Sequence, residues 1–278
     1  SADHLKNVRL KNIGEIGPET NWQEALSNID AVLHLGGRAH VMAESDADPL
    51  AAYRRINRDG TKRLAEAAAD AGVKRLVFLS SIKVNGERTT NHPYSEASTP
   101  QPEDAYGQSK WEGEQALHEI NGLETVVVRT PLVYGPHVKG NFRSLLNICR
   151  KTVPLPLGGL QNRRSLIYVG NLADALIRCL THPKAAGNLY LVRDGDDVST
   201  TTLIKSTAQA LGKQTYLFPV PRLLLRAGGA LTGKSGMVSR LIESLEVDDS
   251  AIRRDLDWTP PFTMVQGLTE TATWFRSV

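Results

Sequence analysis

The feature that most constrains this chain is the alternation of short apolar runs with amphipathic runs over its first 130 residues. Short apolar runs suit buried strands, and the amphipathic runs between them suit crossover helices. The predicted strands cover residues 8–13, 31–35, 75–79 and 124–128, and the predicted helices cover residues 22–26, 61–71 and 106–120. The pattern therefore predicts an α/β fold with a parallel sheet.

After Pro136 the alternation gives way to short pieces rich in proline and glycine. A predicted helix near 172–181 and a predicted strand near 188–192 return to the main sheet, and residues 200–278 read as helices with irregular connections. We expect one domain of residues 1–135 with about 165–195, and a smaller mixed lobe of residues 136–164 and 196–278.

Charge and apolar content argue against several classes of partner. The 278 residues include 33 Lys and Arg against 30 Asp and Glu, and no long run of one sign marks a nucleic-acid or membrane surface. The apolar runs are far shorter than the roughly 20 residues that a spanning helix needs. We therefore expect neither nucleic-acid nor membrane partners.

The cysteine and histidine residues carry no metal or disulfide pattern. Cys149 and Cys179 are too few for a disulfide framework, and neither they nor the histidines have ligand spacing. The polar first residues lack a signal-peptide core. These observations predict a cytoplasmic protein without a metal site.

One pairing of side chains indicates proton chemistry. Tyr106 and Lys110 lie four residues apart, on one face of a predicted helix, where an ammonium group favours the phenolate form. Ser80 and Ser81 follow a predicted strand, at the sheet edge where open α/β sheets bind ligands. The alternatives are an exposed helix pair and a strand end without function.

These residues resemble the short-chain dehydrogenase/reductase superfamily, and within it the NAD-dependent epimerase/dehydratase family that acts on nucleotide sugars. Further segments follow in the order of that family: residues 29–38, Asn57 to Thr61 (Asn-x-x-Gly-Thr), residues 129–136 and residues 164–173. The resemblance implies a Rossmann-like, doubly wound parallel sheet that binds a dinucleotide, with the smaller lobe binding substrate.

The resemblance also implies residue roles. Tyr106 would be the acid and base at the sugar 4-hydroxyl, Lys110 would bind the nicotinamide ribose and lower the pKa of the tyrosine, and Ser81 would bind the sugar oxygen. The expected contacts of NAD, with NADP left open, are Glu15, Ile16, Leu35, Gly36, Gly37, Asn57, Ser80, Tyr106, Lys110, Pro131 and Val133. The expected contacts of a UDP-linked sugar are Ser81, Lys83, Asn141 and Arg164.

The implied activity is epimerisation at C4 of a nucleotide sugar, in a homodimer that pairs through helices near 49–71 and 106–120. Reduction of a 4-keto sugar stays open, as does a cofactor-sensing protein without catalysis. Dehydration is disfavoured, because Ser81, Ile82 and Lys83 stand where the related 4,6-dehydratases carry Thr-Asp-Glu. Asn85 stands where the family usually has tyrosine.

Two further segments need an interpretation. Nothing before Val8 supplies the first strand, glycine-rich turn and helix of the family, so we expect that about 35 or more natural residues are missing from this sequence. Residues 228–235 spell a P-loop, but the preceding residues read as an amphipathic helix instead of the strand that a P-loop follows. No triphosphate site is expected there.

Overall fold

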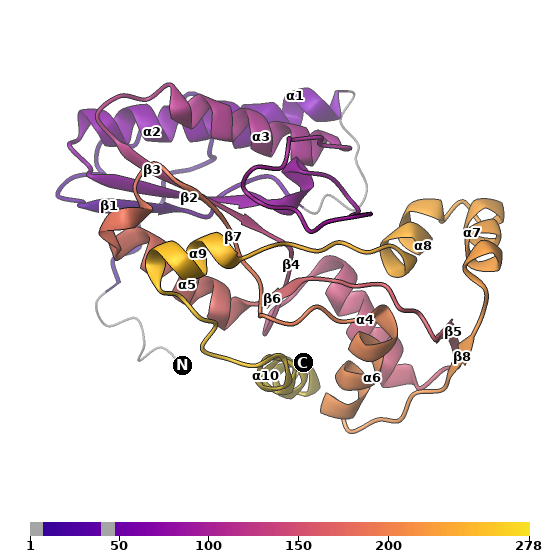
Figure 1. Ribbon diagram of the computed structural model, residues 1–278. Coiled ribbons are helices and arrows are strands. Elements are labelled where there is room, and N and C mark those ends of the chain that lie inside the picture. The colour runs from indigo at the N-terminus through magenta and orange to yellow at the C-terminus, as the bar shows by residue number, and fades with distance from the viewer. Residues whose placement is uncertain (1–7, 40–47) are drawn as a thin grey trace.

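The computed structural model describes residues 8–39 and 48–278. Its main sheet is parallel, with the strand order β1-β2-β3-β7 (Figure 1). These strands are β1 (Ala31–His34), β2 (Arg75–Ser81), β3 (Glu124–Thr130) and β7 (Leu189–Leu191). Four of the five predicted strands are thereby confirmed. Residues 8–13 are wrong as a strand: they run as irregular chain, with Val8 52% and Leu10 87% exposed.

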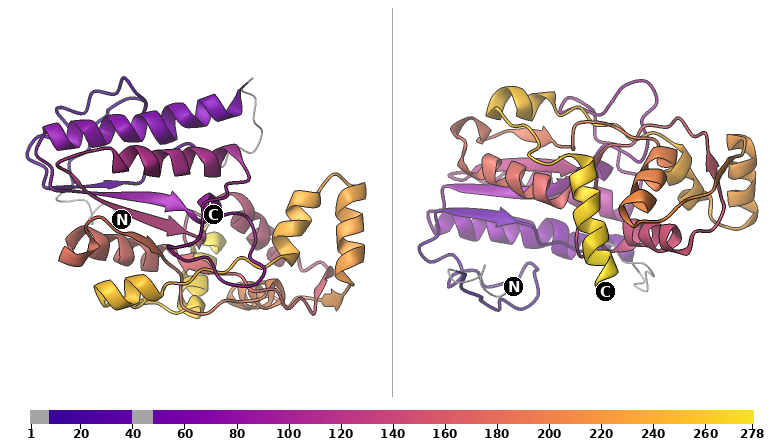
Figure 2. Two further views of the ribbon diagram at one scale, coloured as in Figure 1. Left: turned by 45° about the horizontal axis from the view of Figure 1, so that its top comes forward. Right: turned by 90° about the horizontal axis from the view of Figure 1, so that it is seen from below.

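Helices cover both faces of the main sheet (Figures 1 and 2). One face carries α1 (Pro49–Arg54), a π-helical turn η2 (Arg55–Gly60), α2 (Thr61–Asp70) and α3 (Ala105–His118). The other face carries α5 (Val169–Thr181) and α9 (Ser250–Leu256). Two apolar clusters fill the layers, one on each side of the strands. This is the parallel α/β sheet that the alternation predicts, in the doubly wound arrangement that the family resemblance implies.

Two predicted helices differ from the structure. The helix predicted over 61–71 begins earlier, because Asp48 caps α1 by accepting a hydrogen bond from the Ala51 N–H at 3.0 Å. From there α1, η2 and α2 follow one another without a break. Residues 22–26 form turns, although Trp22 and Leu26 still pack into the apolar core.

Beyond the main sheet and the helices that cover it, the described chain forms two short parallel strand pairs and five further helices. The strands β4 (Leu132–Tyr134) and β6 (Leu166–Tyr168) pair with each other, as do β5 (Leu155–Gly158) and β8 (Leu217–Pro219). The helices are α4 (Gly140–Lys151), α6 (Thr200–Ala210), α7 (Arg222–Leu231), α8 (Ser235–Ile242) and α10 (Met264–Arg276). Two 3-10 turns lie elsewhere in the chain: η3 (Ile82–Val84) follows β2, and η4 (Pro183–Ala185) follows α5. The predicted helical character of residues 200–278 is confirmed.

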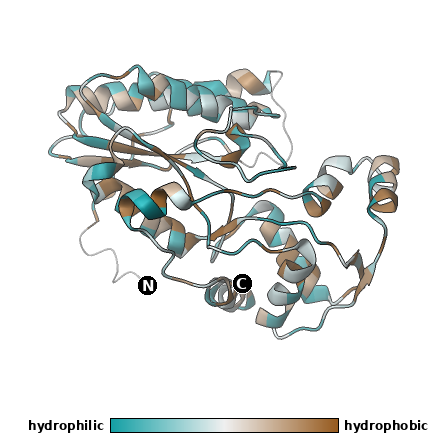
Figure 3. Ribbon diagram, in the orientation of Figure 1, coloured by the Kyte–Doolittle hydropathy of each residue, from teal (hydrophilic) through white to brown (hydrophobic). Residues whose placement is uncertain are grey.

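Hydrophobic residues follow the strands of the main sheet and also colour part of α7 at the edge of the molecule (Figure 3). The P-loop spelling of residues 228–235 spans the end of α7 and the start of α8, so a helix precedes it. In the described part of the chain, no helix is long and apolar enough to cross a bilayer. Within residues 8–39 and 48–278, no group of His, Cys, Asp and Glu could hold a metal ion.

Candidate active site

The carboxyl end of β2 delivers Ser81 to the edge of the sheet. β2 runs two residues further than predicted, because Ser80 and Ser81 stay in register with Arg129 and Thr130 of β3. Ser81 then caps the 3-10 turn η3, accepting a hydrogen bond from the Lys83 N–H at 3.2 Å. Its hydroxyl is also hydrogen-bonded to the Tyr106 phenol.

Tyr106 is placed by the first turn of α3. Asp104 caps this helix by accepting a hydrogen bond from the Gly107 N–H at 2.7 Å. A Cβ on Gly107 would lie only 2.6 Å from the carbonyl oxygen of Lys83. The glycine therefore lets the first turn of α3 pack directly on the backbone that follows Ser81, which brings the phenol to the serine.

Lys83 joins the two segments electrostatically. Its ammonium group pairs with Glu87 at 2.6 Å and with Asp104 at 2.5 Å. Burial alone would lower the pKa of Lys83, but these hydrogen bonds more than offset it and raise the pKa. Lys83 is therefore held as a cation beside the helix that carries Tyr106.

The pKa of Tyr106 lies above its ordinary value, chiefly because burial disfavours the phenolate. The hydrogen bond from Ser81 and the positive charge of Lys83 act in the opposite direction. Lys83 is therefore the cation whose charge lowers this pKa here, and the expected effect of Lys110 on the phenol stays a prediction.

Lys110 lies one helical turn beyond Tyr106, with its ammonium nitrogen 4.1 Å from the centroid of the Phe78 ring. Burial lowers the pKa of Lys110 to about 7, although the negative charge of Glu114 opposes the shift. A buried amine that titrates near neutrality is sensitive to any charge or hydrogen-bond acceptor brought beside it.

A buried ionic network lies under this group. Arg129 of β3 donates to both oxygens of Glu114 on α3, at 3.0 and 2.5 Å. It also donates to the side-chain oxygen of Asn85 at 3.1 Å. Ser80 donates to the same glutamate, and the Asn85 amide donates to the Ser98 carbonyl at 3.1 Å. Asn85 thus ties the loop before α3 to β3, a polar role that the usual tyrosine could not fill in the same way.

The carboxyl end of β1 forms a narrow cradle. A Cβ on Gly36 would lie 2.4 Å from Ile16, and one on Gly37 would lie 3.0 Å from the Asn57 side-chain oxygen and 3.6 Å from the Lys110 nitrogen. Only glycine leaves room for a ligand to approach the backbone here. The cradle therefore fits the dinucleotide that the sequence predicts, between Ile16, Asn57 and Lys110.

Asn57 holds the cradle in shape from inside the π-helical turn η2. Its side-chain oxygen accepts from the Arg38 N–H at 2.8 Å, and its amide donates to the Arg38 carbonyl at 3.1 Å and to the Ser109 hydroxyl at 2.9 Å. Ser109 in turn donates to the Tyr106 carbonyl at 2.8 Å. The amide of Asn57 therefore links the backbone after β1 to the helix of Tyr106.

The other expected cofactor contacts lie around the same edge or follow β3. Glu15 is exposed, Ile16 packs between Gly36 and Gly60, and Leu35 is 56% exposed just after β1. Pro131 is buried directly after β3, and Val133 lies in β4. The strand ends of the sheet therefore bring together residues that are far apart in the sequence.

The expected substrate residues divide between two places. Lys83 lies beside Tyr106, whereas Arg164 and Asn141 belong to the smaller lobe. Arg164 is mostly buried and donates to the Glu243 carbonyl at 3.4 Å. Burial lowers the pKa of Arg164 to about 10, with Glu87 raising it and Arg240 lowering it. Asn141 is exposed in the first turn of α4.

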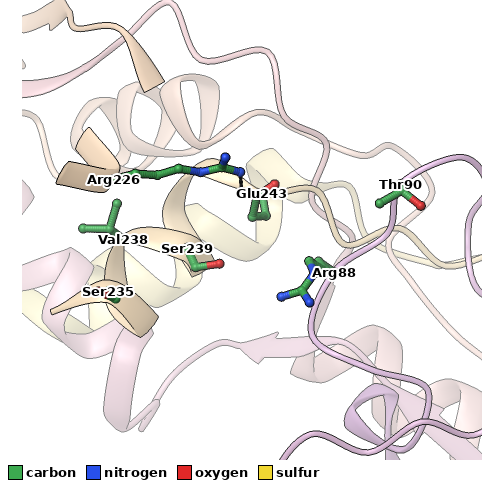
Figure 4. A pocket seen from close by; sticks show the side chains of 7 residues that line it. All are labelled: Arg88, Thr90, Arg226, Ser235, Val238, Ser239 and Glu243. Carbon is green, nitrogen blue, oxygen red and sulfur yellow. Dashed lines mark hydrogen bonds and ion pairs between the residues drawn. The ribbon is translucent and has the colours of Figure 1, made fainter. Parts of the chain in front are cut away.

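A pocket opens between the loop after η3 and the helices of the smaller lobe (Figure 4). Its lining residues are Arg88, Thr90, Arg226, Ser235, Val238, Ser239 and Glu243. Glu243 pairs with Arg226 across the pocket wall, and its carbonyl accepts from Arg164. The sequence analysis named none of these lining residues.

The positioning residues Asp104, Glu114 and Arg129 were also missed. An aspartate directly before a predicted helix is a recognisable cap signal, so Asp104 could have been found. Glu114 and Arg129 carry no such signal, because a charged residue in a helix or strand is normally exposed. Only the packing of α3 on β2 and β3 makes them partners.

Comparisons with known proteins agree with this geometry. A model of the NAD dependent epimerase/dehydratase family matches residues 5–192. The UDP-glucose 4-epimerase of Vibrio cholerae is 44% identical over 271 residues, which cover 96% of this chain and 83% of that protein. The N-acetyl-alpha-D-glucosaminyl-diphospho-ditrans,octacis-undecaprenol 4-epimerase of Escherichia coli O157:H7 is 26% identical and covers 94% of this chain and 82% of its own.

Among solved structures, the UDP-glucose 4-epimerase of Thermotoga maritima with UDP-glucose has a TM-score of 0.74 and 22% identity. The superposition covers 100% of this chain and 87% of that chain. At this identity the likeness shows a shared fold, with its doubly wound sheet.

Proposed function

Because the chain belongs to the NAD-dependent epimerase/dehydratase family, we propose that it is an NAD-dependent 4-epimerase of UDP-hexoses. The observation that carries the proposal is the placement of Ser81 beside the Tyr106 phenol at the carboxyl end of β2, with Lys110 one turn further along α3. The 44% identity to the Vibrio cholerae UDP-glucose 4-epimerase supports this substrate class.

The residues of the site would move a proton at the sugar 4-hydroxyl. Tyr106 takes this proton as the C4–O bond gains carbonyl character and returns it in the reverse step. Ser81, which lies beside the phenol, would stabilise the same oxygen. The positive charge of Lys83 stabilises the phenolate and so acts to lower the pKa of Tyr106.

NAD, when bound, supplies the hydride acceptor and donor at C4. Gly36 and Gly37 would let it approach the backbone, and Asn57 keeps that backbone fixed. Lys110 would hydrogen-bond the ribose hydroxyls. Burial lowers the pKa of this amine to about 7, and the ribose would give the buried group hydrogen-bond partners. Glu15, Ile16, Leu35, Ser80, Pro131 and Val133 are the other proposed contacts.

The smaller lobe, residues 136–164 and 196–278, is the proposed substrate-binding part. Arg164 supports this assignment, because its mostly buried guanidinium group makes its one hydrogen bond within the described chain to a backbone carbonyl. Such a group suits the diphosphate of a nucleotide sugar. Asn141 is the weaker candidate, at the exposed start of α4.

Substituting Tyr106→Phe tests the assignment. The variant should keep the fold but lose at least about 99% of the epimerase turnover of UDP-glucose, since acid and base groups typically contribute 10²–10⁴-fold. Tyr190→Phe in β7, which removes a hydroxyl that donates to the Lys184 carbonyl at 3.3 Å, is the matched control and should stay active. A Tyr106→Phe variant with more than about a tenth of the activity would refute the assignment.

Cofactor retention separates the epimerase from the reductase. An epimerase regenerates its cofactor in each cycle, so native mass spectrometry should show NAD retained by the purified protein. A reductase consumes reduced cofactor and must exchange it, so turnover that requires added NADH or NADPH would favour that alternative. A protein that binds cofactor without turning over any nucleotide sugar would favour a sensing role.

Two further assignments are part of the proposal. We propose a homodimer that pairs through the α1–η2–α2 segment and α3, testable by sedimentation. We also propose a cytoplasmic location, which the two buried free thiols of Cys149 and Cys179 support, because a reducing compartment leaves such residues unpaired.

A further inference from the structure

Positive charge is concentrated in one segment of the smaller lobe. Residues 198–242 contain no aspartate or glutamate, which leaves all 30 acidic residues and 27 of the 33 basic residues in the rest of the chain. The six basic residues of this segment are Lys205, Lys213, Arg222, Arg226, Lys234 and Arg240. The near-neutral balance of the whole chain therefore conceals a segment with a basic excess, in which Arg226 and Arg240 pair with Glu243 and Glu87 and the other four cations make no ion pair within the described chain.

Large apolar side chains are exposed on the same segment. Six of the 17 exposed large hydrophobic residues in the described chain lie between residues 216 and 237. Leu223 is 76% exposed and Leu231 is 89% exposed. We call this set the α7 surface, and it consists of Tyr216, Phe218, Leu223, Leu224, Leu231 and Met237.

The packing of α7 explains why this surface faces outward. Gly229 turns toward α8, where its Cβ position would lie 2.8 Å from Val238. Arg222 donates to the Ile242 carbonyl at 2.7 Å, and Arg226 pairs with Glu243, so both basic side chains reach along the flank of α8. Leu223 and Leu231, eight residues apart on α7, are instead exposed. The helix itself lies at the edge of the molecule (Figures 1 and 3).

A helix with exposed leucines on one side and arginines on its flank has the pattern of an element that lies in a membrane interface. A second copy of this chain is a poor occupant, because two such cationic regions would repel each other. Nucleic acid would satisfy the charge but would leave the leucines in water. An anionic lipid surface satisfies both, since the leucines enter the acyl boundary while the cations meet the headgroup phosphates.

We propose that the α7 surface docks this protein reversibly on anionic lipid bilayers. The expectation of no membrane partner rested on the absence of a long run of one charge and of a spanning helix, whereas this proposal rests on an exposed apolar surface beside basic residues. Because α8 also lines the pocket of Figure 4, docking would hold that pocket close to the lipid headgroups.

The experiment is co-sedimentation with vesicles of phosphatidylcholine and phosphatidylglycerol, compared with vesicles of phosphatidylcholine alone. The wild-type chain should bind the anionic vesicles, and binding should weaken in 1 M salt, where the Debye length falls to about 3 Å. The triple variant Leu223→Ser, Leu224→Ser, Leu231→Ser should bind at least about tenfold more weakly, since it removes the apolar part of the contact.

A second variant and a matched control keep the test decisive. Lys213→Glu with Lys234→Glu should also weaken binding, and both residues are exposed, so the fold should tolerate the change. Ile177→Ser with Val265→Ser removes two equally exposed apolar residues on α5 and α10 and should leave vesicle binding unchanged. Turnover of soluble UDP-glucose should be the same in the wild-type chain and the triple variant.

Three results would overturn the proposal. The first is a wild-type chain that does not bind anionic vesicles. The second is a triple variant that binds them as well as the wild-type chain while the lysine variant does too. The third is self-association that the leucine substitutions abolish in the absence of vesicle binding, which would assign the α7 surface to a second copy.

Discussion

At the scale of single residues, the chemistry depends on how three side chains share charge. Tyr106 is disfavoured as a phenolate by burial, and Ser81 and Lys83 counter that effect. Lys83 can do so because Asp104 and Glu87 keep it protonated. The nitrogen of Lys110 lies 3.6 Å from the position of a Cβ on Gly37, beside the cradle where we propose that the cofactor binds.

Replacing Lys83 tests this division of roles. In Lys83→Met the loss of positive charge should raise the pKa of Tyr106, so the acid limb of the kcat/KM profile should move to higher pH. Lys83→Arg keeps the charge and should keep the limb near its original position. A loss of activity that is uniform across pH, with no movement of the limb, would show that Lys83 acts only through structure or substrate contact.

At the scale of elements, α3 is the part that organises the site. Its first turn carries Tyr106, its second turn carries Lys110, and its third turn sends Glu114 into the core between β2 and β3. Glu114 and Arg129 are 3% and 5% exposed, so each depends on the other for compensation of its charge. The ionic contact therefore fixes the register of α3 against the sheet.

Glu114→Gln should lower the free energy of unfolding by about 3–5 kcal/mol, because it leaves the buried Arg129 charge uncompensated. The control is Glu112→Gln on the same helix, which removes the partly exposed pair with Arg54 and should cost about 1 kcal/mol or less. Urea denaturation followed by circular dichroism measures both. Equal losses in the two variants would mean that the buried pair contributes no more than a surface pair.

At the scale of the whole molecule, the pocket lies where the loop after the main sheet's β2 meets the smaller lobe. Arg164 reaches this region from the segment before β6, and Glu87 and Arg240 both act on its pKa. Residues from three distant parts of the sequence therefore set the charge of one site.

Arg164→Met should raise the KM for UDP-glucose by about ten- to hundredfold, the usual range for a lost hydrogen bond to a charged group. Its kcat should change much less, because the diphosphate is remote from C4. Arg163→Met is the control, since Arg163 is 60% exposed and pairs only with Asp197 and Glu246 at the surface. An unchanged KM in Arg164→Met would remove this residue from the substrate site.

The sequence by itself determined the class of fold and proposed the candidate proton-transfer residues. Short apolar runs specified the strands at 31–35, 75–79 and 124–128, and an amphipathic run specified the helix near 106–120, because the burial of apolar faces is read locally. The spacing of Tyr106 and Lys110, and the place of Ser81 after a strand, are equally local. The short segments at 8–13 and 22–26 were wrong, since patterns this short do not fix a conformation without partners.

Only the tertiary structure decided which charges act together. Lys83 meets Asp104 across 21 residues, Glu114 meets Arg129 across 15, and Asn57 reaches Ser109 across 52. The sequence contains the cations and leucines of α7, but only the packing of α7 on α8 decides which side of the helix is exposed. Electrostatic and hydrogen-bond partners depend on distance in space, and a sequence pattern carries that distance only over a few residues.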